Sequence, residues 1–441
     1  MLNRFYLAQE TWGMLYKSKA ISKNQRRKRM SNGNFSQVLV IGGGSGGIAA
    51  AASLLKRDSS LSITLIEPSD HHYYQPGWTM VGGGIFDAFE TERTTESVIP
   101  NKANWIRSSV KSFDPENNIV NLIDGSTWEY DYLVVATGLT LKWDMVEGLE
   151  ECLGNNGVTS NYRFDLAPYT WELVKNLRQG TAIFTQPPMP IKCAGAPQKA
   201  MYLSCSHWHE QGVLTNINVA FHNAGGALFG VSDYVPALME YVNQYGADLC
   251  FNQNLVAVDG AAKTAWFDVT DDTGNIIRKE QKFDMLHVCP PQASPDIIAK
   301  SSLANEGGWL DINQHDLQHN KFDNIFGIGD VISAPNAKTA AAVRTQAPIL
   351  ANNLIASMHK NGEKRYYHGY GSCPLTVEHG KIVLAEFGYG GKIIPTFPTW
   401  LINGLQPGRL AWILKKDVLP KIYWDAMLKG REWLTKSSKE I

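Results

Sequence analysis

The chain has few cysteines for its length and no excess of charge of one sign. Six cysteines lie at irregular spacing in 441 residues, without a Cys-x-x-Cys pair, which excludes a disulfide-stabilised scaffold. Lysine and arginine number 41 and aspartate and glutamate 42, so the formal net charge is −1. This balance gives no reason to expect a nucleic-acid partner. We expect no metal site either.

A long apolar segment of the kind that crosses a membrane is also missing. Residues 38–55 carry no charge, and 18 residues is the length of a marginal membrane span. Five glycines within residues 42–47 argue against a lipid-exposed helix. A strand, a tight turn and a helix explain the run better, so we predict no membrane-spanning helix.

The first 35 residues differ in composition from the rest of the chain. They contain eight lysines and arginines but a single acid, Glu10, with apolar residues interleaved. A basic, acid-poor and weakly amphipathic segment is typical of an organelle transit peptide. A disordered basic tail is the alternative.

The remainder alternates short β-branched runs with helical patterns, which is typical of parallel sheets with right-handed crossovers. Strands are expected at residues 38–41, 63–67, 132–135, 182–184, 218–221 and 285–288, with a helix over about 46–56. The pattern predicts an α/β protein with two Rossmann-like domains, the first of them discontinuous. The expected boundaries are 36–150 with 320–365, then 151–319, then a C-terminal segment 366–441.

A glycine-rich motif follows the first expected strand. Gly42, Gly44 and Gly47 match the G-x-G-x-x-G pattern, with Ser45 and Gly46 between them. Glycine permits the tight turn and lets backbone amides approach a pyrophosphate at the start of the next helix. At the end of the second strand, Glu67 is placed to accept hydrogen bonds from ribose hydroxyls. The motif predicts a bound dinucleotide.

Two further pieces indicate which dinucleotide is bound. Thr137 and Gly138 follow a buried strand, and Gly329-Asp330 ends a later one. With the glycine loop, they resemble the FAD-binding pattern of the two-dinucleotide-domain flavoproteins. The resemblance implies that Asp330 holds the ribityl and pyrophosphate side. The helix expected from about Lys338 would then stabilise negative charge on reduced flavin with its positive end.

A second nucleotide loop is absent where such flavoproteins would carry one. Three prolines and Cys193 follow the strand 182–184, and proline removes amide donors that would hold a phosphate. We therefore do not expect NAD(P)H binding there. A helix start at Ala196 and the nearby Lys192 and Lys199 would lower the pKa of the Cys193 thiol. The alternative is a buried, inert cysteine.

The other cysteines are placed less clearly by the sequence. Cys205 lies too far along the same helix to reach the reactive thiol. Cys250 and Cys289 end apolar strands and are expected in the core, and Cys152 is expected in a loop between charged segments. Cys373 is expected in a turn that leads into a strand. Local sequence alone does not bring it to the reactive thiol.

Specific motifs extend the resemblance over residues 38–433. The matching segments are 42–47, 72–79, 192–199, 326–330, 338–342 and 372–375. Through them the chain resembles the sulfide:quinone oxidoreductases, above all the mitochondrial type found in animals. The Lys-Cys-Ala-Gly-Ala-Pro-Gln-Lys element at 192–199 is highly specific, whereas the FAD motifs alone indicate only the superfamily.

The resemblance implies a mechanism. Cys193 and Cys373 match a redox pair linked through a disulfide or a bridging sulfur. Hydrogen sulfide attacks on the Cys373 side and leaves a persulfide there, whose sulfur passes to a small acceptor such as glutathione or sulfite. The Cys193 side passes two electrons to non-covalent FAD, which delivers them to ubiquinone. Glu151 and Lys199 match acid–base positions, although Glu151 has the alternative of a solvated loop carboxylate.

The same resemblance assigns further positions and a location. Gln75 falls in a matching segment beside the cofactor, and Lys338 and Lys415 match lysines near the quinone. Residues 400–431 mix tryptophan and aliphatic residues with lysine, which suits an interfacial helix pair lying on a membrane surface. An ordinary docked helix pair is the alternative. We expect a peripheral protein of the mitochondrial inner membrane.

Two other functions stay open from sequence. A type II NADH:quinone dehydrogenase would need a second glycine-rich loop near residue 185 and no cysteines. A redox-sensing flavoprotein would bind FAD without being reduced by sulfide.

Overall fold

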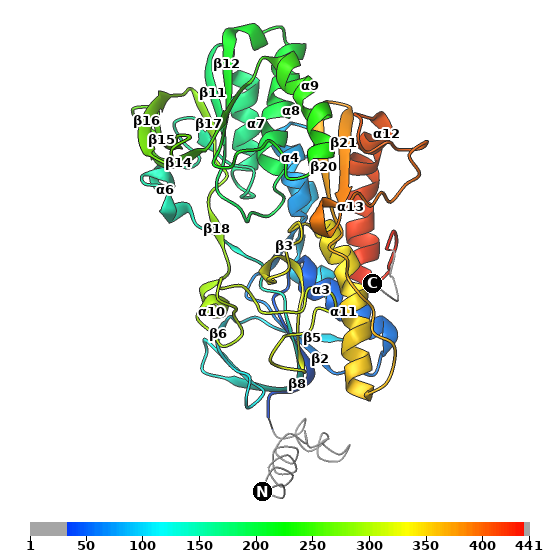
Figure 1. Ribbon diagram of the computed structural model, residues 1–441. Helices are drawn as coiled ribbons and strands as arrows, with labels where there is room; N and C mark the ends of the chain where they lie inside the picture. Colours follow the sequence, from blue (N-terminus) through cyan, green and yellow to red (C-terminus); the bar gives the residue numbers. More distant parts are fainter. Residues whose placement is uncertain (1–32, 436–441) are drawn as a thin grey trace, which may run out of the picture.

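Two α/β lobes are stacked end to end, and the C-terminal part of the chain runs along one side of both (Figure 1). The structure is a computed structural model that describes residues 33–435. The expected transit peptide therefore lies almost entirely outside the described residues. Among residues 33–435, no helix has the length and apolar character needed to cross a membrane.

The first sheet has seven strands in the order β5-β2-β1-β8-β7-β6, with β19 also paired to β8. Their bounds are β1 (Phe35–Ile41), β2 (Ile63–Ile66), β5 (Ala103–Ile106), β6 (Val110–Asp114), β7 (Ile119–Leu122), β8 (Thr127–Val135) and β19 (Ile325–Gly327). The strands around β1 are parallel, and the apolar residues at their centre are buried because helices and loops cover both faces of the sheet.

Two long helices, α3 (Ser45–Arg57) and α11 (Ala340–His359), pack against each other beside this sheet. α3 begins directly after the glycine loop, and its alanines are fully buried. Thr339 caps α11, since its hydroxyl accepts a hydrogen bond of 3.2 Å from the Ala342 amide. Each helix follows a parallel strand, so both N-termini lie at the carboxyl edge of the sheet.

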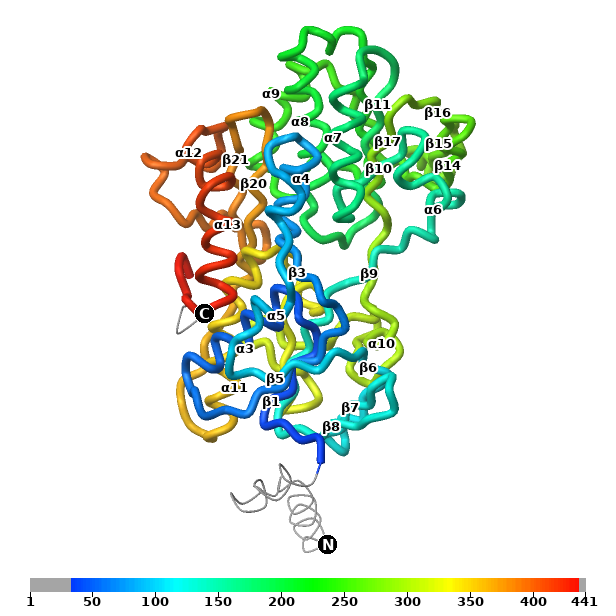
Figure 2. Tube along the Cα trace, turned by 180° about the vertical axis from the view of Figure 1, so that it is seen from behind, coloured from blue at the N-terminus to red at the C-terminus, as the bar shows by residue number. Residues whose placement is uncertain are grey.

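The second sheet is parallel, with the order β10-β17-β11-β12-β13. Its strands are β10 (Val158–Thr159), β11 (Gly180–Gln186), β12 (Ile217–Asn223), β13 (Asp248–Phe251) and β17 (Met285–His287). Its helices are α7 (Ala167–Asn176), α8 (Ala196–Glu210) and α9 (Val235–Tyr245), and a three-stranded sheet adds β14 (Gln253–Asp259), β15 (Thr264–Thr270) and β16 (Ile276–Lys282). The lobes are connected through the paired strands β9 (Thr140–Leu141) and β18 (Gln292–Ala293) (Figure 2).

The C-terminal part consists of a hairpin and an irregular helix. The hairpin strands β20 (Gly371–Glu378) and β21 (Lys381–Phe387) pack on α8. The helix runs through α12 (Arg409–Ile413), α13 (Leu419–Lys421) and the π-helical turns Leu414–Val418 and Ile422–Ala426. The expected helix pair is thus one helical segment. Pro420 lacks an amide donor, and a wide turn on its N-terminal side accommodates that loss.

Several shorter elements complete the chain. They are β3 (His71–Tyr73), β4 (Glu92–Thr94), α4 (Trp78–Gly82), α5 (Thr95–Val98), α6 (Leu149–Cys152) and α10 (Asp296–Ala299). The prediction of an α/β fold with Rossmann-like sheets is confirmed. Two local expectations were wrong: Cys373 lies in strand β20 and not in a turn, and Cys152 ends helix α6 and is buried.

Candidate active site: a thiol pair at the edge of a nucleotide cavity

The hairpin brings Cys373 to Cys193. The two sulfur atoms are 3.9 Å apart although the residues are separated by 180 positions in the chain. Cys193 lies just before α8, and β20 packs against that helix. Side chains alternate along a strand, so Cys373 and Leu375 point to the same side, into the apolar core around α8. Both cysteines are free thiols in the structure.

The backbone of Cys193 is held in an unusual conformation. Its φ is +49°, a left-handed value that costs free energy for a residue other than glycine. Its amide donates to the Lys338 carbonyl at 2.9 Å, and its carbonyl accepts from the Ala196 amide at 2.7 Å. The Tyr162 hydroxyl is 3.2 Å and 3.4 Å from the Lys192 and Cys193 carbonyls. These contacts fix the direction of the thiol.

Charge is distributed unequally between the two thiols. The pKa of Cys193 is lowered well below its usual value, first by the hydrogen bond from the Cys373 thiol. Desolvation opposes this effect, but the buried Lys199 ammonium, 3.2 Å from the Cys193 sulfur, adds to it, and together the two partners outweigh desolvation. The pKa of Cys373 is raised because it donates to Cys193 and is buried. Cys193 is therefore the thiolate and Cys373 the thiol.

The close approach of the two sulfurs requires a glycine at position 195. A Cβ atom at this position would lie 2.5 Å from the Cys373 sulfur and 2.4 Å from Cδ2 of Leu375. Real Cβ atoms do not approach heavy atoms so closely, so a larger residue here would push the hairpin away from α8. Glycine is needed for the close approach of the two sulfurs.

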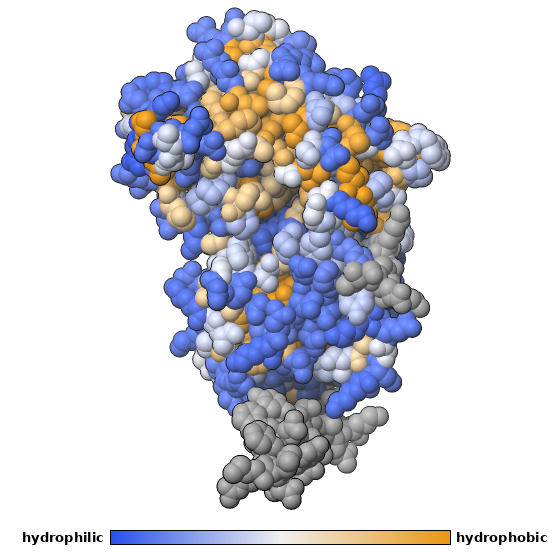
Figure 3. All heavy atoms as spheres, viewed as in Figure 1, coloured by the Kyte–Doolittle hydropathy of each residue, from blue (hydrophilic) through white to orange (hydrophobic). Residues whose placement is uncertain are grey.

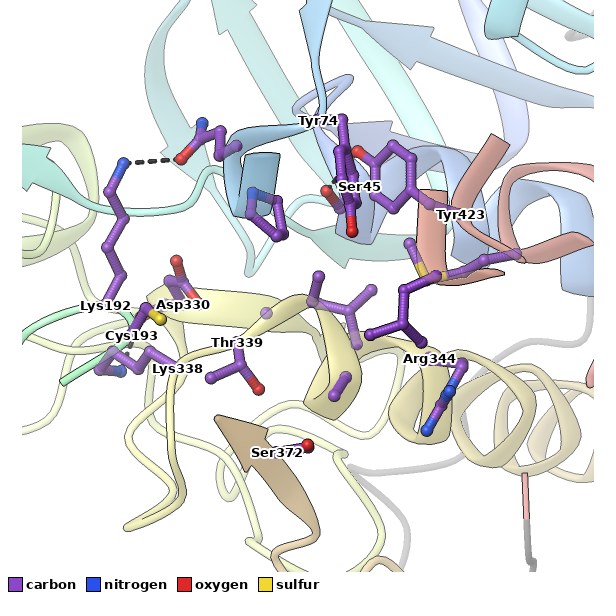
Figure 4. Close-up of a pocket in the computed structure, with 18 of the residues that line it drawn as sticks. Ser45, Tyr74, Lys192, Cys193, Asp330, Lys338, Thr339, Arg344, Ser372 and Tyr423 are labelled. Atoms are coloured by element: carbon purple, nitrogen blue, oxygen red, sulfur yellow. Dashed lines mark hydrogen bonds between the residues drawn. The ribbon is translucent and has the colours of Figure 1, made fainter. Parts of the chain in front are cut away.

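A cavity of about 380 Å³ extends from the glycine loop to Cys193. In the view of Figure 4, Cys193, Asp330 and Lys338 lie on one side of it and Arg344 and Tyr423 on the other. Residues from both lobes and from the C-terminal helix line it. The thiolate therefore opens into the space that the nucleotide loop borders.

The glycine loop has the geometry of a phosphate cradle. Gly42 has φ +100°, and a Cβ at Gly47 would lie 1.8 Å from the Gly42 carbonyl oxygen. No side chain caps α3, so its first amides stay available to an anion. The Glu67 carboxylate accepts from the Gly43 amide at 2.6 Å and lines the cavity, at one residue beyond the end of β2. Gly44, Ser45 and Gly46 line it as well.

Buried polar atoms without partners in the cavity wall fit a large polar ligand. Thr137 Oγ1, Trp78 Nε1 and Thr79 Oγ1 are buried and have no hydrogen-bond partner within the described chain. Such atoms are costly unless a ligand satisfies them. Gly138, Gly329 and the Asp330 carboxylate line the same space, and burial raises the pKa of Asp330. The wall suits a dinucleotide such as FAD.

Three predicted polar residues stand around this cavity. The Lys338 ammonium donates to the Asp330 and Ile332 carbonyls at 2.7 and 3.0 Å, and burial lowers its pKa to about 8. The Lys415 ammonium donates to the Pro76 carbonyl at 2.7 Å. Its pKa falls to about 7, through burial first and repulsion by Lys199 second. Gln75 accepts a hydrogen bond of 2.6 Å from Lys192.

The structure does not bring Glu151 to the thiols. This residue is exposed on α6 and lines a separate hollow with Cys152, Trp266 and Arg278. Its short helix belongs to the packing around β14, remote in the fold from the start of α8. The solvated-carboxylate alternative matches this placement, and Glu151 has no part in the site described here.

Several polar contacts that shape the cavity were not predicted from the sequence. The Tyr423 hydroxyl is 2.7 Å from His72 Nε2 and 2.7 Å from Ser45 Oγ, which ties the C-terminal helix to the nucleotide loop. Burial lowers the pKa of His72 to about 4, so this ring is neutral. Glu386 on β21 lines the cavity too, as does Arg344 on α11. No local motif marks these residues, because their partners lie far away in the chain.

The remaining described thiols are of a different kind. Cys205 and Cys289 are buried, and burial raises the pKa of both, that of Cys289 to about 12. Cys250 is half-buried on β13 and its pKa is also raised by burial. Within residues 33–435, no group of three or more histidine, cysteine or acidic side chains could hold a metal ion.

A parallel sheet with a glycine-rich phosphate loop, facing a thiol pair, defines the class of dinucleotide-dependent disulfide oxidoreductases. Residues 36–178 match the pyridine nucleotide-disulphide oxidoreductase family. Curated relatives that are 35 to 41% identical over most of the chain are named mitochondrial sulfide:quinone oxidoreductases. That of Dictyostelium discoideum is 41% identical over 431 residues, which cover 97% of this chain and 92% of the relative.

The chain belongs to the sulfide:quinone oxidoreductase family and is an oxidoreductase. The family prediction from the 192–199 and 372–375 elements is thereby confirmed.

Solved structures show the same fold. The sulfide:quinone oxidoreductase of Aquifex aeolicus has a TM-score of 0.74 at 22% identity, covering 90% of this chain and 92% of that one. A chain in the Tetrahymena thermophila mitochondrial ATP synthase tetramer has a TM-score of 0.78 at 21% identity, covering 90% and 97%. At such identities these likenesses concern the fold alone.

Proposed function

We propose that this protein oxidises hydrogen sulfide at Cys193 and Cys373 and passes two electrons through FAD to ubiquinone. The observation that carries the proposal is the thiol pair itself, with sulfurs 3.9 Å apart and Lys199 3.2 Å from Cys193. An inert core cysteine would have neither a second thiol nor a buried cation beside it. The relatives named sulfide:quinone oxidoreductase support sulfide and a quinone as the two substrates.

The unequal pKa values set the direction of the sulfur chemistry. In the oxidised protein the two cysteines form a disulfide. Hydrosulfide attacks the Cys373 sulfur, an S–S bond forms to it, and the bond toward Cys193 breaks. Cys193 is the better leaving group because its thiolate is stabilised. Lys199 neutralises the negative charge that develops there.

The sulfur left on Cys373 is then transferred to a small thiophilic acceptor, glutathione or sulfite, which frees Cys373 as a thiolate. When the linkage reforms between the two cysteines, two electrons leave the sulfur pair. FAD supplies the chemistry that the side chains lack, as a carrier that takes two electrons and hands them to a quinone. Gly42, Gly44, Gly47, Glu67, Thr137 and Asp330 would hold it.

We further propose that the protein lies on the mitochondrial inner membrane, with the C-terminal segment toward the lipid. Exposed apolar side chains concentrate there: Trp400, Leu401, Leu405, Leu410, Ile413 and Val418. Lys416 and Lys421 are exposed among them. In the face shown in Figure 3, apolar side chains gather over the half that carries β20 and β21, while the other half is mostly hydrophilic. Such a surface suits an amphipathic element in a lipid interface.

Replacing either thiol tests the proposal. We expect Cys193→Ser and Cys373→Ser each to lower sulfide-dependent ubiquinone reduction at least about 10³-fold, the scale seen when a covalent catalytic group is removed. FAD content, measured by absorbance after denaturation, should stay at the wild-type level. Cys250→Ser is the matched control, because Cys250 lies on β13 and does not belong to the pair of sulfurs 3.9 Å apart. Wild-type turnover in Cys193→Ser or Cys373→Ser would overturn the assignment.

A further inference from the structure

A polar cluster lies in the cavity wall, apart from the thiols. The Tyr370 hydroxyl donates to Glu386 Oε1 at 2.6 Å and is 3.0 Å from Thr396 Oγ1. The Thr396 amide donates to Glu386 Oε2 at 3.0 Å, and Arg344 Nη2 donates to the Tyr370 hydroxyl at 3.2 Å. All four residues line the cavity. The sulfur chemistry proposed above uses none of them.

Side chains alternate between the two faces of the hairpin, which places this cluster on the face opposite Cys373. Cys373 on β20 pairs with Ala385 on β21, and these side chains belong to the core around α8. The neighbouring pairs, Ser372 with Glu386 and Pro374 with Leu384, point to the opposite face and line the cavity. One hairpin thus places a thiol on one face and a carboxyl group on the other.

Arg344 has unused hydrogen-bonding capacity at this point. Its side chain is 8% exposed, and its Nε is buried without a partner among the described residues. A buried guanidinium N–H without an acceptor costs free energy unless a ligand oxygen fills the place. The position therefore favours a ligand that carries an oxygen acceptor.

The cavity wall beside the cluster is apolar. Leu384, Phe397, Leu414 and Leu419 line it. They belong to a small core that also contains Ile402 and Ala411, close in sequence to the exposed Leu401 and Leu410. A ligand that fits both parts has an apolar body and a polar oxygen at one end. A quinone with its isoprenoid tail has this chemistry.

We propose that Arg344, Tyr370 and Glu386 form the head-group end of the quinone site, in which Tyr370 gives a proton to the quinone oxygen and Glu386 restores it. This inference rests on the proposed function, because it needs the reduced flavin that sulfide oxidation generates. Arg344 binds the oxygen through Nε. Its positive charge offsets the negative charge that grows on that oxygen during reduction.

A quinone becomes a quinol by gaining two electrons and two protons. Reduced flavin, when bound, would supply both electrons and one proton. The second proton leaves the Tyr370 hydroxyl as the quinol O–H bond forms. The Glu386 carboxylate, which the amide and hydroxyl of the half-buried Thr396 hold, then takes a proton from solvent and passes it to the Tyr370 oxygen.

Other titratable groups face the cluster and have to be distinguished from it. Burial and the Glu386 charge raise the pKa of Tyr370, so it stays a neutral donor. The Tyr234 hydroxyl donates to the Glu386 backbone carbonyl at 3.1 Å and so is not a proton path. Tyr74 and Lys415 reach the cavity from the other side, where Lys415 Nζ lies 5.9 Å from the Tyr74 ring. Lys415 is the rival proton donor.

Mixing the reduced holoenzyme with a quinone tests the inference directly. The flavin is reduced photochemically, not by sulfide, and its reoxidation by decylubiquinone is followed by stopped-flow absorbance. We expect Glu386→Gln to slow the saturated rate by about 10²-fold, the usual effect of losing a general acid. The solvent deuterium isotope effect should become larger in this variant. Tyr370→Phe, which keeps the ring, should slow the rate equally.

The control is Glu378→Gln on the same strand as Cys373. Glu378 also accepts a hydrogen bond from a tyrosine, at 2.9 Å from Tyr241, but does not line the cavity. It should reoxidise at the wild-type rate. Arg344→Gln should instead raise the quinone concentration needed for half-maximal rate, with a smaller effect on the saturated rate. The flavin content of each variant shows that it is folded.

The outcomes separate the inference from the function on which it rests. Wild-type reoxidation rates in Glu386→Gln and Tyr370→Phe would overturn the inference, as would a large loss in Lys415→Met alone. Failure of sulfide to reduce the wild-type flavin would overturn the proposed function. Because photochemical reduction bypasses the thiols, the inference can be judged even then.

Discussion

Lys199 and Cys373 together decide the charge of the Cys193 sulfur. The thiol hydrogen bond and the ammonium at 3.2 Å both favour thiolate, and they act in a buried place where electrostatic effects are strong. The lowered pKa means that Cys193 remains a thiolate as the pH falls below the usual range for cysteine. Its nucleophilicity should therefore persist in mildly acidic solution.

Removing the ammonium should shift this titration upward. In the reduced protein, we expect the pH profile of Cys193 alkylation by iodoacetamide to move to higher pH in Lys199→Gln. At pH 6 the alkylation rate should fall, because less thiolate is present. Quantitative mass spectrometry of the Cys193 peptide measures it. Lys175→Gln, an exposed lysine on α7, is the control. Identical profiles for Lys199→Gln and wild type would show that the ammonium does not set the charge.

The sequence predicts only some of the groups that surround the Cys193 sulfur. Cys193, Lys199 and the helix start that follows them are adjacent in the chain, so their proximity is local. Cys373 and Tyr162 are not, and only the packing of β20 on α8 and of the 160–162 loop beside Cys193 brings them in. The position of Glu386 in the cavity wall could not be predicted, because nothing in the sequence around a single glutamate in an apolar strand indicates its distant hydrogen-bond partners.

At the scale of elements, the parallel strands were the easiest to predict. Uncharged β-branched runs locate β1, β2 and the second half of β8 to within a few residues. The C-terminal helix was harder. Its alternation of aromatic, aliphatic and lysine residues fits two helices as well as one, and the π-helical turns that keep it continuous have no sequence signature.

The C-terminal segment should determine membrane binding. Trp400 is 83% exposed and Leu401 42%, and burying such side chains contributes about 1.5–3 kcal/mol each. We expect Trp400→Ser with Leu401→Ser to weaken co-sedimentation with cardiolipin-containing vesicles at least about tenfold. Phe89→Ser serves as the control, since Phe89 is 76% exposed and lies outside the C-terminal segment. Equal vesicle binding by all three proteins would contradict the assignment of this surface.

At the scale of the whole molecule, the candidate active site lies where three parts of the chain meet. The first lobe supplies the glycine loop, the second supplies Cys193 and Lys199, and the C-terminal hairpin supplies Cys373 and Glu386. The paired strands β9 and β18 and the C-terminal helix hold these parts together. Sequence patterns identify each part, but the way the hairpin returns to α8 depends on long-range packing.

An anaerobic titration of the purified flavoprotein, followed by its flavin absorbance, distinguishes sulfide from a nicotinamide as the electron donor. Electrons are expected to enter from sulfur at the thiol pair and not from a nicotinamide, since proline replaces the second phosphate loop. Sulfide should therefore bleach the flavin band, whereas NADH at the same concentration should leave it unchanged. Bleaching by NADH with no response to sulfide would show that electrons enter from a nicotinamide and not from the thiol pair.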